Sequence, residues 1–159
     1  MRPTVTLSLA LAAATLATVV IAPVALAAPK AAGPRTIEIR ASDAMRYDVT
    51  IIKAKPGERL TVRLIAVGTM PKIAMSHNFI LLKKGVTAQA FADKAIAAQA
   101  TGYLPPAAKS QVVASTGVIG NGERTEVTFT VPTAPGRYEY ICTFPGHCAS
   151  GMKGVLIVS

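Results

Sequence analysis

The chain has few cysteines, few histidines and few acidic residues, and each shortage excludes a class of protein or of site. Cys142 and Cys148 are its only cysteines, so a bridge between these two is the only disulfide possible within the chain. His77 and His147 are its only histidines. The sequence also shows no pairing of a nucleophile with a base, which argues against an enzyme.

Acidic side chains are outnumbered by basic ones, 8 Asp and Glu against 17 Lys and Arg, which gives a net charge of +9. Loss of Arg2 with the leader described below leaves about +8. A basic surface suits an acidic partner protein or an anionic membrane face, and electrostatic steering makes such docking fast and salt-dependent. The basic residues are scattered, without an aromatic and basic stacking motif, which argues against a nucleic-acid partner.

The only run that approaches a membrane span in length lies in residues 1–27, which are typical of an export signal. Arg2 alone makes the N-terminal region basic, and residues 5–21 are uncharged and apolar. Ala-Leu-Ala at 25–27 provides the cleavage motif. We therefore expect a signal peptide, cleaved directly after this motif, and a periplasmic location. The alternative is a retained membrane anchor. Pro23 would break such a membrane helix near its end, which favours a signal peptide that is removed over a retained anchor.

After a linker over 28–34, rich in Pro, Ala and Gly, the chain predicts one domain of short strands over 35–159. The clearest strand is 124–131, in which Thr125, Val127, Phe129 and Val131 share one face and Arg124, Glu126, Thr128 and Thr130 share the other. Further strands are expected over residues 36–40, 47–53, 59–67, 137–142 and 154–158. Pro-Gly and Asn-Gly pairs mark the turns. The pattern predicts an all-β fold, an antiparallel β-sandwich or barrel.

An alanine-rich segment, Thr87 to Gly102, departs from this strand pattern. Its apolar residues recur near helical spacing, with Thr87 as a plausible N-cap and Gly102 as a stop. We expect one inserted amphipathic helix that lies across the sandwich as a packing element.

The two histidines lie in segments suited to a metal. Cys142, His147 and Met152 follow one another at five-residue intervals, and His77 opens an apolar run some seventy residues upstream. Two imidazoles, a thiolate and a thioether are the ligands of an electron-transfer copper site, in which Met is the weak axial ligand. Strand alternation directs Cys142 inward, and the turn at Pro145-Gly146 lets His147 return to the same point.

Other interpretations of these residues remain open. A Cys142–Cys148 disulfide would consume the thiolate, so we expect a free, metal-bound Cys142 and a packed Cys148 thiol. Structural zinc accepts the same ligands. A periplasmic copper-binding or trafficking protein is the main alternative function, although such proteins favour exposed, flexible sites with several thioethers or histidines.

Two neighbours of the ligands have expected supporting roles. Asn78 follows His77, and its side chain is placed to hydrogen-bond the ligand loop and to hold the two halves of the site in register. Pro145 has no amide hydrogen, so fewer donors can reach the Cys142 sulfur, which tends to raise the reduction potential.

The metal-site motifs resemble the azurin branch of the small blue copper proteins, the cupredoxins. The matching segments are Met75-Ser76-His77-Asn78, Cys142-Thr143-Phe144-Pro145-Gly146-His147 and Met152-Lys153-Gly154. Asp43 to Asp48, Tyr103-Leu104-Pro105 and Ile119 to Glu123 are also azurin-like in order and spacing. The resemblance therefore covers most of the chain after the linker.

This resemblance implies a Greek-key β-sandwich with one type 1 copper ion that cycles between Cu(I) and Cu(II). Its implied ligands are His77, Cys142 and His147, with Met152 as the distant axial ligand and the Ser76 carbonyl opposite. It also implies redox partner proteins, such as a cytochrome, an oxidase or a reductase. Electrons would pass through His147 at the surface edge, and the implied docking patch is formed by Met75, Phe144, Pro145 and Gly146.

Two features depart from typical azurins. No cysteine precedes Cys142, so the disulfide near the N-terminus of azurins has no counterpart. The loop between His147 and Met152 holds four residues, one more than in typical azurins, and is closer to the auracyanins.

Overall fold

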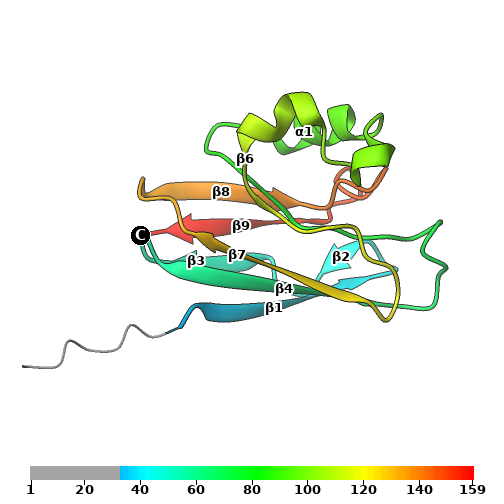
Figure 1. Cartoon of the computed structure of the whole chain (residues 1–159), viewed down its shortest axis with the longest axis horizontal. Helices are drawn as coiled ribbons and strands as arrows, with labels where there is room; N and C mark the ends of the chain where they lie inside the picture. Colours follow the sequence, from blue (N-terminus) through cyan, green and yellow to red (C-terminus); the bar gives the residue numbers. More distant parts are fainter. Residues whose placement is uncertain (1–32) are drawn as a thin grey trace, which may run out of the picture. The chain divides into compact units, whose positions relative to one another are not determined.

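The computed structural model describes residues 33–159, in which two β-sheets pack face to face (Figure 1). The expected signal peptide lies outside the described residues, as does most of the linker. The strands are β1 (Arg35–Ser42), β2 (Arg46–Tyr47), β3 (Ile51–Ala54), β4 (Arg59–Val67), β5 (Ile80–Leu82), β6 (Val112–Ser115), β7 (Arg124–Thr130), β8 (Gly136–Ile141) and β9 (Lys153–Val158). Within residues 33–159, no helix is both long and apolar enough to cross a membrane.

The strand order is β2-β1-β4-β7 in one sheet and β3-β9-β8-β5-β6 in the other. This two-sheet arrangement confirms the predicted all-β sandwich. Most strand pairs are antiparallel, as expected, but β1 pairs with β4, and β3 with β9, in parallel. Both parallel pairs arise because the chain crosses between the sheets before it returns beside an earlier strand.

The segment predicted as one strand over 47–53 is two short strands in different sheets. β2 pairs with β1, and β3 pairs with β9. Between them the chain bends at Asp48, whose carboxylate accepts a hydrogen bond from the Arg40 amide at 2.7 Å. Tyr47 and Ile52 are both buried although they lie an odd number of positions apart, so the alternating pattern shifts phase at the bend.

The core fills the space between the sheets. On β7, Phe129 is buried while Arg124, Glu126, Thr128 and Thr130 are exposed, as the sequence predicted. Tyr138, Tyr140 and Cys142 are buried in the same apolar cluster, which confirms that β8 directs Cys142 inward. Cys142, the residue directly after β8, therefore places its thiol in this core cluster.

The predicted helix over 87–102 is shorter than expected. α1 spans Ala88–Ala95, and the 3-10 turn η1 (Gln99–Thr101) follows it. Thr87 is the N-cap residue, but its side chain makes no capping hydrogen bond. Gly102 closes η1 with a left-handed φ of 66°. A further 3-10 helix, η2 (Pro106–Gln111), leads into β6. The strand β6 was not predicted from the sequence.

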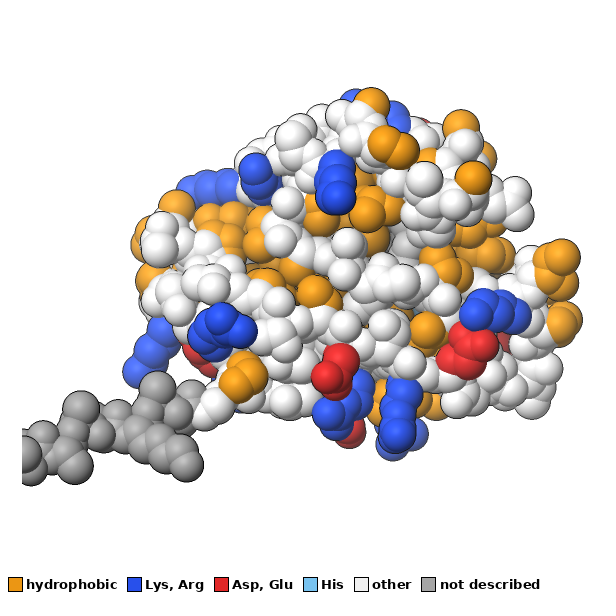
Figure 2. Space-filling view, viewed as in Figure 1, with side chains coloured by type: hydrophobic (Ala, Val, Ile, Leu, Met, Phe, Trp, Pro, Cys, Tyr) orange, Lys and Arg blue, Asp and Glu red, His pale blue; other side chains and the backbone are white. Residues whose placement is uncertain are grey.

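α1 covers the outer face of the five-stranded sheet (Figure 1). Its Phe91 and Ala92 lie in an apolar cluster with Ile80 of β5, Ile141 of β8 and Cys148. The helix is thus a packing element, as expected, and it holds the outer side of the strand that carries Cys142. Figure 2 shows lysine and arginine side chains spread over one face rather than gathered in one patch.

Candidate metal centre

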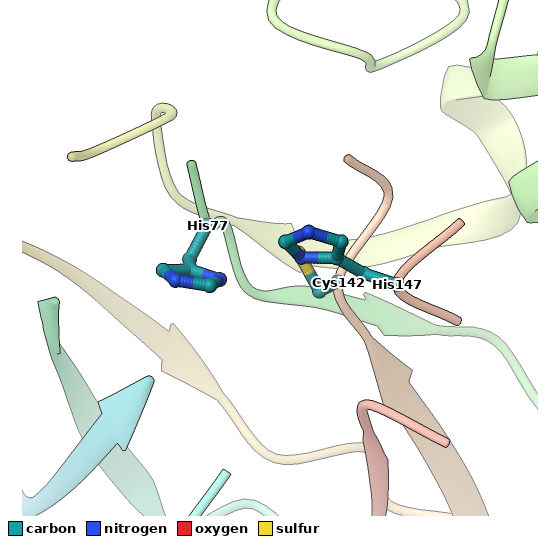
Figure 3. A group of neighbouring side chains, drawn as sticks. All are labelled: His77, Cys142 and His147. Carbon is teal, nitrogen blue, oxygen red and sulfur yellow. The ribbon is translucent and has the colours of Figure 1, made fainter. Parts of the chain in front are cut away.

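His77, Cys142 and His147 lie close together in space, although His77 is distant in the chain from the other two (Figure 3). Their candidate ligand atoms all lie within 4.8 Å of one another, and all three residues are buried. Within residues 33–159 this is the one group of three or more His, Cys, Asp or Glu residues that could hold a metal ion. The structure therefore brings together the three strongest predicted ligands.

His77 lies just before a strand rather than on one. It forms an isolated bridge with Ile119, in which each backbone N–H donates to the other residue's carbonyl at 2.8 Å. β5 begins three residues later, at Ile80. The bridge fixes the backbone of His77, so its imidazole enters the site from a firmly held segment.

The loop after β8 positions the remaining predicted ligands. The Cys142 amide donates to the Met152 carbonyl at 3.1 Å, and the Met152 amide donates to the His147 carbonyl at 2.9 Å. The chain can reverse at Gly146 because this residue adopts a φ of 82°, which favours glycine. Met152 is fully buried in the same cluster as Cys142. On the opposite strand segment, the Ser76 carbonyl oxygen lies 4.0 Å from the Cys142 sulfur.

Burial keeps the three side chains uncharged in the metal-free protein. It raises the pKa of the Cys142 thiol to about 12, even though the backbone N–H groups of Asn78 and Phe144 donate to the sulfur and oppose this rise. Burial and, to a lesser degree, His77 lower the pKa of His147 to about 4. The pKa of His77 is also lowered by burial. Both imidazoles are therefore neutral near pH 7 and have a lone pair free for a metal.

The donor atoms fit a soft transition-metal ion. Nδ1 of His77 is the one buried side-chain nitrogen or oxygen within residues 33–159 that has no hydrogen-bond partner. Nδ1 of His147 lies 3.4 Å from the Cys142 sulfur. An orphaned nitrogen in a dry pocket is costly unless a ligand binds it. Two imidazole nitrogens and one thiol sulfur in a closed site match the donor set of type 1 copper.

The two cysteines do not form a disulfide. Both are free and buried. Cys142 belongs to the core cluster between the sheets, whereas Cys148 belongs to the separate cluster under α1. This confirms Cys148 as a packed thiol and leaves the Cys142 sulfur available to a metal.

His147 was expected at the surface edge, and this expectation was wrong. Its exposed fraction is only 2%, close to the 1% of His77. The ring of Phe144 packs against its imidazole with centroids 4.9 Å apart, and the ring of Tyr103 lies edge-on to Phe144 at 5.2 Å. His147 is therefore buried beside Phe144, which Tyr103 contacts in turn.

Asn78 joins the two ligand-bearing segments, as the sequence predicted. Its side-chain oxygen accepts a hydrogen bond from the Thr143 amide at 2.8 Å, and its side-chain nitrogen donates to the Thr143 hydroxyl at 2.7 Å. Since Asn78 follows His77 and Thr143 follows Cys142, the pair holds these two ligands in register. Thr143 was missed from the sequence. Its position directly after the inward-facing Cys142 is the signal that could have identified it.

The turn after η1 completes this network. Gly102 accepts a hydrogen bond from the Asn78 side chain at 3.2 Å, and Tyr103 accepts one from the Thr143 hydroxyl at 2.7 Å. Tyr103 has a φ of 59°, which is uncommon for a residue other than glycine. Such a conformation persists where its surroundings hold it, and here the two carbonyls of the turn are both bound to the network.

Known copper proteins match both the sequence and the fold. The model of the plastocyanin/azurin family of copper-binding proteins matches residues 35–159. Azurin from Achromobacter denitrificans is 41% identical over 124 residues, which are 76% of this chain and 82% of that azurin.

Among solved structures, the dithionite-reduced auracyanin of Roseiflexus castenholzii is 34% identical and has a TM-score of 0.70, covering 80% of this chain and 99% of that one. Auracyanin A of Chloroflexus aurantiacus, a "blue" copper protein, is 38% identical and has a TM-score of 0.68, covering 80% of this chain and all of that one. These matches confirm the resemblance and, with the His-Cys-His site, a single type 1 copper ion as cofactor. The chain therefore belongs to the plastocyanin/azurin family of copper-binding proteins and is a blue copper electron-transfer protein.

Proposed function

We propose that the protein carries one electron at a time between redox partner proteins, with its copper ion alternating between Cu(I) and Cu(II). The observation that supports this most directly is the closed site formed by His77, Cys142 and His147, whose donor atoms lie within 4.8 Å of one another. A buried, preformed site limits rearrangement of the ligands, which favours rapid electron transfer. It argues against the alternative of copper trafficking, which requires ready release of the metal.

In this proposal His77, Cys142 and His147 are the strong ligands. Met152 would supply the weak thioether ligand, and the Ser76 carbonyl would supply a weak oxygen donor. Two observations support the weaker roles. The Met152 backbone is hydrogen-bonded to both Cys142 and His147, and the Ser76 carbonyl oxygen already lies 4.0 Å from the Cys142 sulfur.

Partner docking is proposed at the surface that covers His147. Met75 and Phe144 are partly exposed, and Pro145 and Gly146 are exposed. An apolar contact of this kind is small and short-lived, as redox partners require. The net positive charge, +9 for the full chain, favours partners with acidic docking surfaces, and it would make association faster at low salt.

We further propose a periplasmic protein whose residues 1–27 are removed as a signal peptide, with a linker over 28–34 and a cupredoxin domain over 35–159. The match of the family model to residues 35–159 supports the domain boundary. N-terminal sequencing of the exported protein tests the cleavage after Ala27, and retention of the first 27 residues would contradict it.

The decisive test of the function exploits the two cysteines. In the copper-loaded protein, Cys142→Ser removes the thiolate and is expected to abolish the intense visible thiolate-to-copper absorption. Cys148→Ser is the matched control, because this thiol packs under α1 outside the site, and it should keep the colour. Redox titration of the unmodified protein should show reversible one-electron cycling. Persistence of the colour in Cys142→Ser, or a colourless unmodified protein, would overturn the assignment.

A further inference from the structure

Tyr47 places a buried hydroxyl beside the metal centre. This second residue of β2 is only 4% exposed, and its hydroxyl donates a hydrogen bond to the Asn78 carbonyl. No other hydrogen bond to that carbonyl occurs within residues 33–159. Burial and, secondarily, the neighbouring Cys142 raise the pKa of Tyr47 well above its usual value, so the hydroxyl remains a neutral donor.

The residue that Tyr47 holds acts directly on the copper ligands. The Asn78 backbone N–H opposes the rise in the pKa of the buried Cys142 thiol, and the Asn78 side chain makes two hydrogen bonds with Thr143. Tyr47 belongs to the four-stranded sheet, whereas Asn78 and Thr143 border strands of the other sheet. Tyr47 is therefore the polar connection between the first sheet and the network that supports the thiolate.

We propose that the Tyr47 hydroxyl is a positioning group that holds Asn78 in place, thereby raising the reduction potential of the centre and slowing copper release. This inference rests on the proposed electron-transfer function. Without the hydroxyl, the Asn78 carbonyl is buried with no hydrogen-bond partner. It must then reorient, or a water molecule must enter the core and donate to it. Either change loosens the Asn78 amide from the sulfur. Hydrogen bonding at the cysteine sulfur tunes the potential of such sites, and a weaker donor leaves more negative charge on the thiolate, which disfavours the reduced state.

A second tyrosine provides a matched control. The Tyr138 hydroxyl also donates to a backbone carbonyl, that of Ala134 at 2.7 Å, and Tyr138 is only 3% exposed. Ala134 lies in the turn before β8 and carries no ligand. Tyr138→Phe therefore removes the same kind of hydrogen bond from the same core without touching the ligand network.

The experiment compares Tyr47→Phe, Tyr138→Phe and the unmodified protein, each loaded with copper. We expect Tyr47→Phe to lower the reduction potential, to shift the thiolate absorption, and to release copper to a chelator about tenfold faster, the low end of what one unsatisfied buried group costs. Tyr138→Phe should leave all three unchanged. Thermal unfolding of the metal-free variants measures the general cost of losing a hydroxyl, which should be similar in both.

Two outcomes separate this inference from the function on which it rests. If the unmodified protein is blue and cycles reversibly, but Tyr47→Phe matches Tyr138→Phe in potential, absorption and copper release, the positioning role is wrong and the function stands. If Tyr47→Phe does not fold, 3-fluorotyrosine placed at position 47 alone keeps the hydroxyl and makes it a stronger donor. It should then raise the potential, and an unchanged potential would overturn the inference.

Discussion

The outer face of the four-stranded sheet and the metal centre both contain polar contacts that join separate elements, but in opposite surroundings. On the outer face, Arg63 of β4 pairs with Glu38 of β1 at 3.2 Å and with Glu126 of β7 at 3.1 Å, and all three side chains are exposed. In the metal centre, Asn78 and Thr143 make bonds of similar length and are almost fully buried.

The difference lies in what happens when such a contact is lost. Water replaces the partner of an exposed charge at little cost, whereas a buried amide or carbonyl keeps the full penalty of an unmade hydrogen bond. The site is therefore held by a few contacts that each matter greatly. The outer face is held by the packing beneath it, and its ion pairs contribute little.

The strongest test of this contrast is Asn78→Ala. It deletes the bonds to Thr143 and Gly102 and leaves the Thr143 amide buried without an acceptor. We expect the free energy of unfolding to fall by about 3 kcal/mol, and the reduction potential and copper affinity to change with it. Denaturant unfolding, redox titration and competition with a chelator measure the three quantities.

Asn121→Ala is the matched control for this prediction. The Asn121 side chain accepts a hydrogen bond from the Gly68 amide at 3.0 Å, but it is exposed. Its loss should have a small effect on stability and none on the copper. An Asn78→Ala variant with unaltered potential and metal affinity would show that the register between His77 and Cys142 does not depend on this side chain.

Acidification of the metal-free protein is the second test, because it must place charge on the buried imidazoles of the site. The pKa of His147 falls from 6.5 to about 4 on folding, so the unfolded chain binds more protons in this range. The contribution of the neutral His147 to the free energy of unfolding is fully present above pH 6.5. It is lost as the pH falls towards 4, by on the order of 3 kcal/mol or less. His77 contributes in the same direction.

Denaturant unfolding of the metal-free protein between pH 7 and pH 4 measures this loss. His147→Gln is the control, since glutamine cannot titrate in this range; it should remove the part of the loss that is due to His147 and leave the part that is due to His77. An unmodified protein that is equally stable at both pH values would contradict the burial of uncharged imidazoles in the site.

The smallest expected effect belongs to Arg63→Ala on the outer face. Both ion pairs of Arg63 are exposed and screened by solvent, so we expect no resolvable change in the free energy of unfolding and none in the copper absorption or potential. A substantial loss of stability would show that the ion pairs of this face act as a cooperative network, and the contrast with the metal centre would then fail.

The sequence by itself determined the chemistry of this protein and its class of fold. Cys142, His147 and Met152 lie close together in the sequence, and together with His77 they leave few alternatives to a copper site. Strand alternation directed Cys142 inward and separated the two faces of β7, because side-chain direction in a strand depends only on neighbouring residues. The role of Asn78 was also predictable, since it follows His77 directly.

Tertiary structure alone decided the partners and the exposure of these residues. His147 is buried beside the ring of Phe144, and Phe144 is contacted by Tyr103, which lies about forty residues away in the chain. The separation of β2 from β3, the parallel pairs and the contact of Tyr47 with Asn78 likewise depend on which strands meet across the sandwich. Local pattern specifies which way a side chain points, whereas long-range packing determines what it meets there and whether water reaches it.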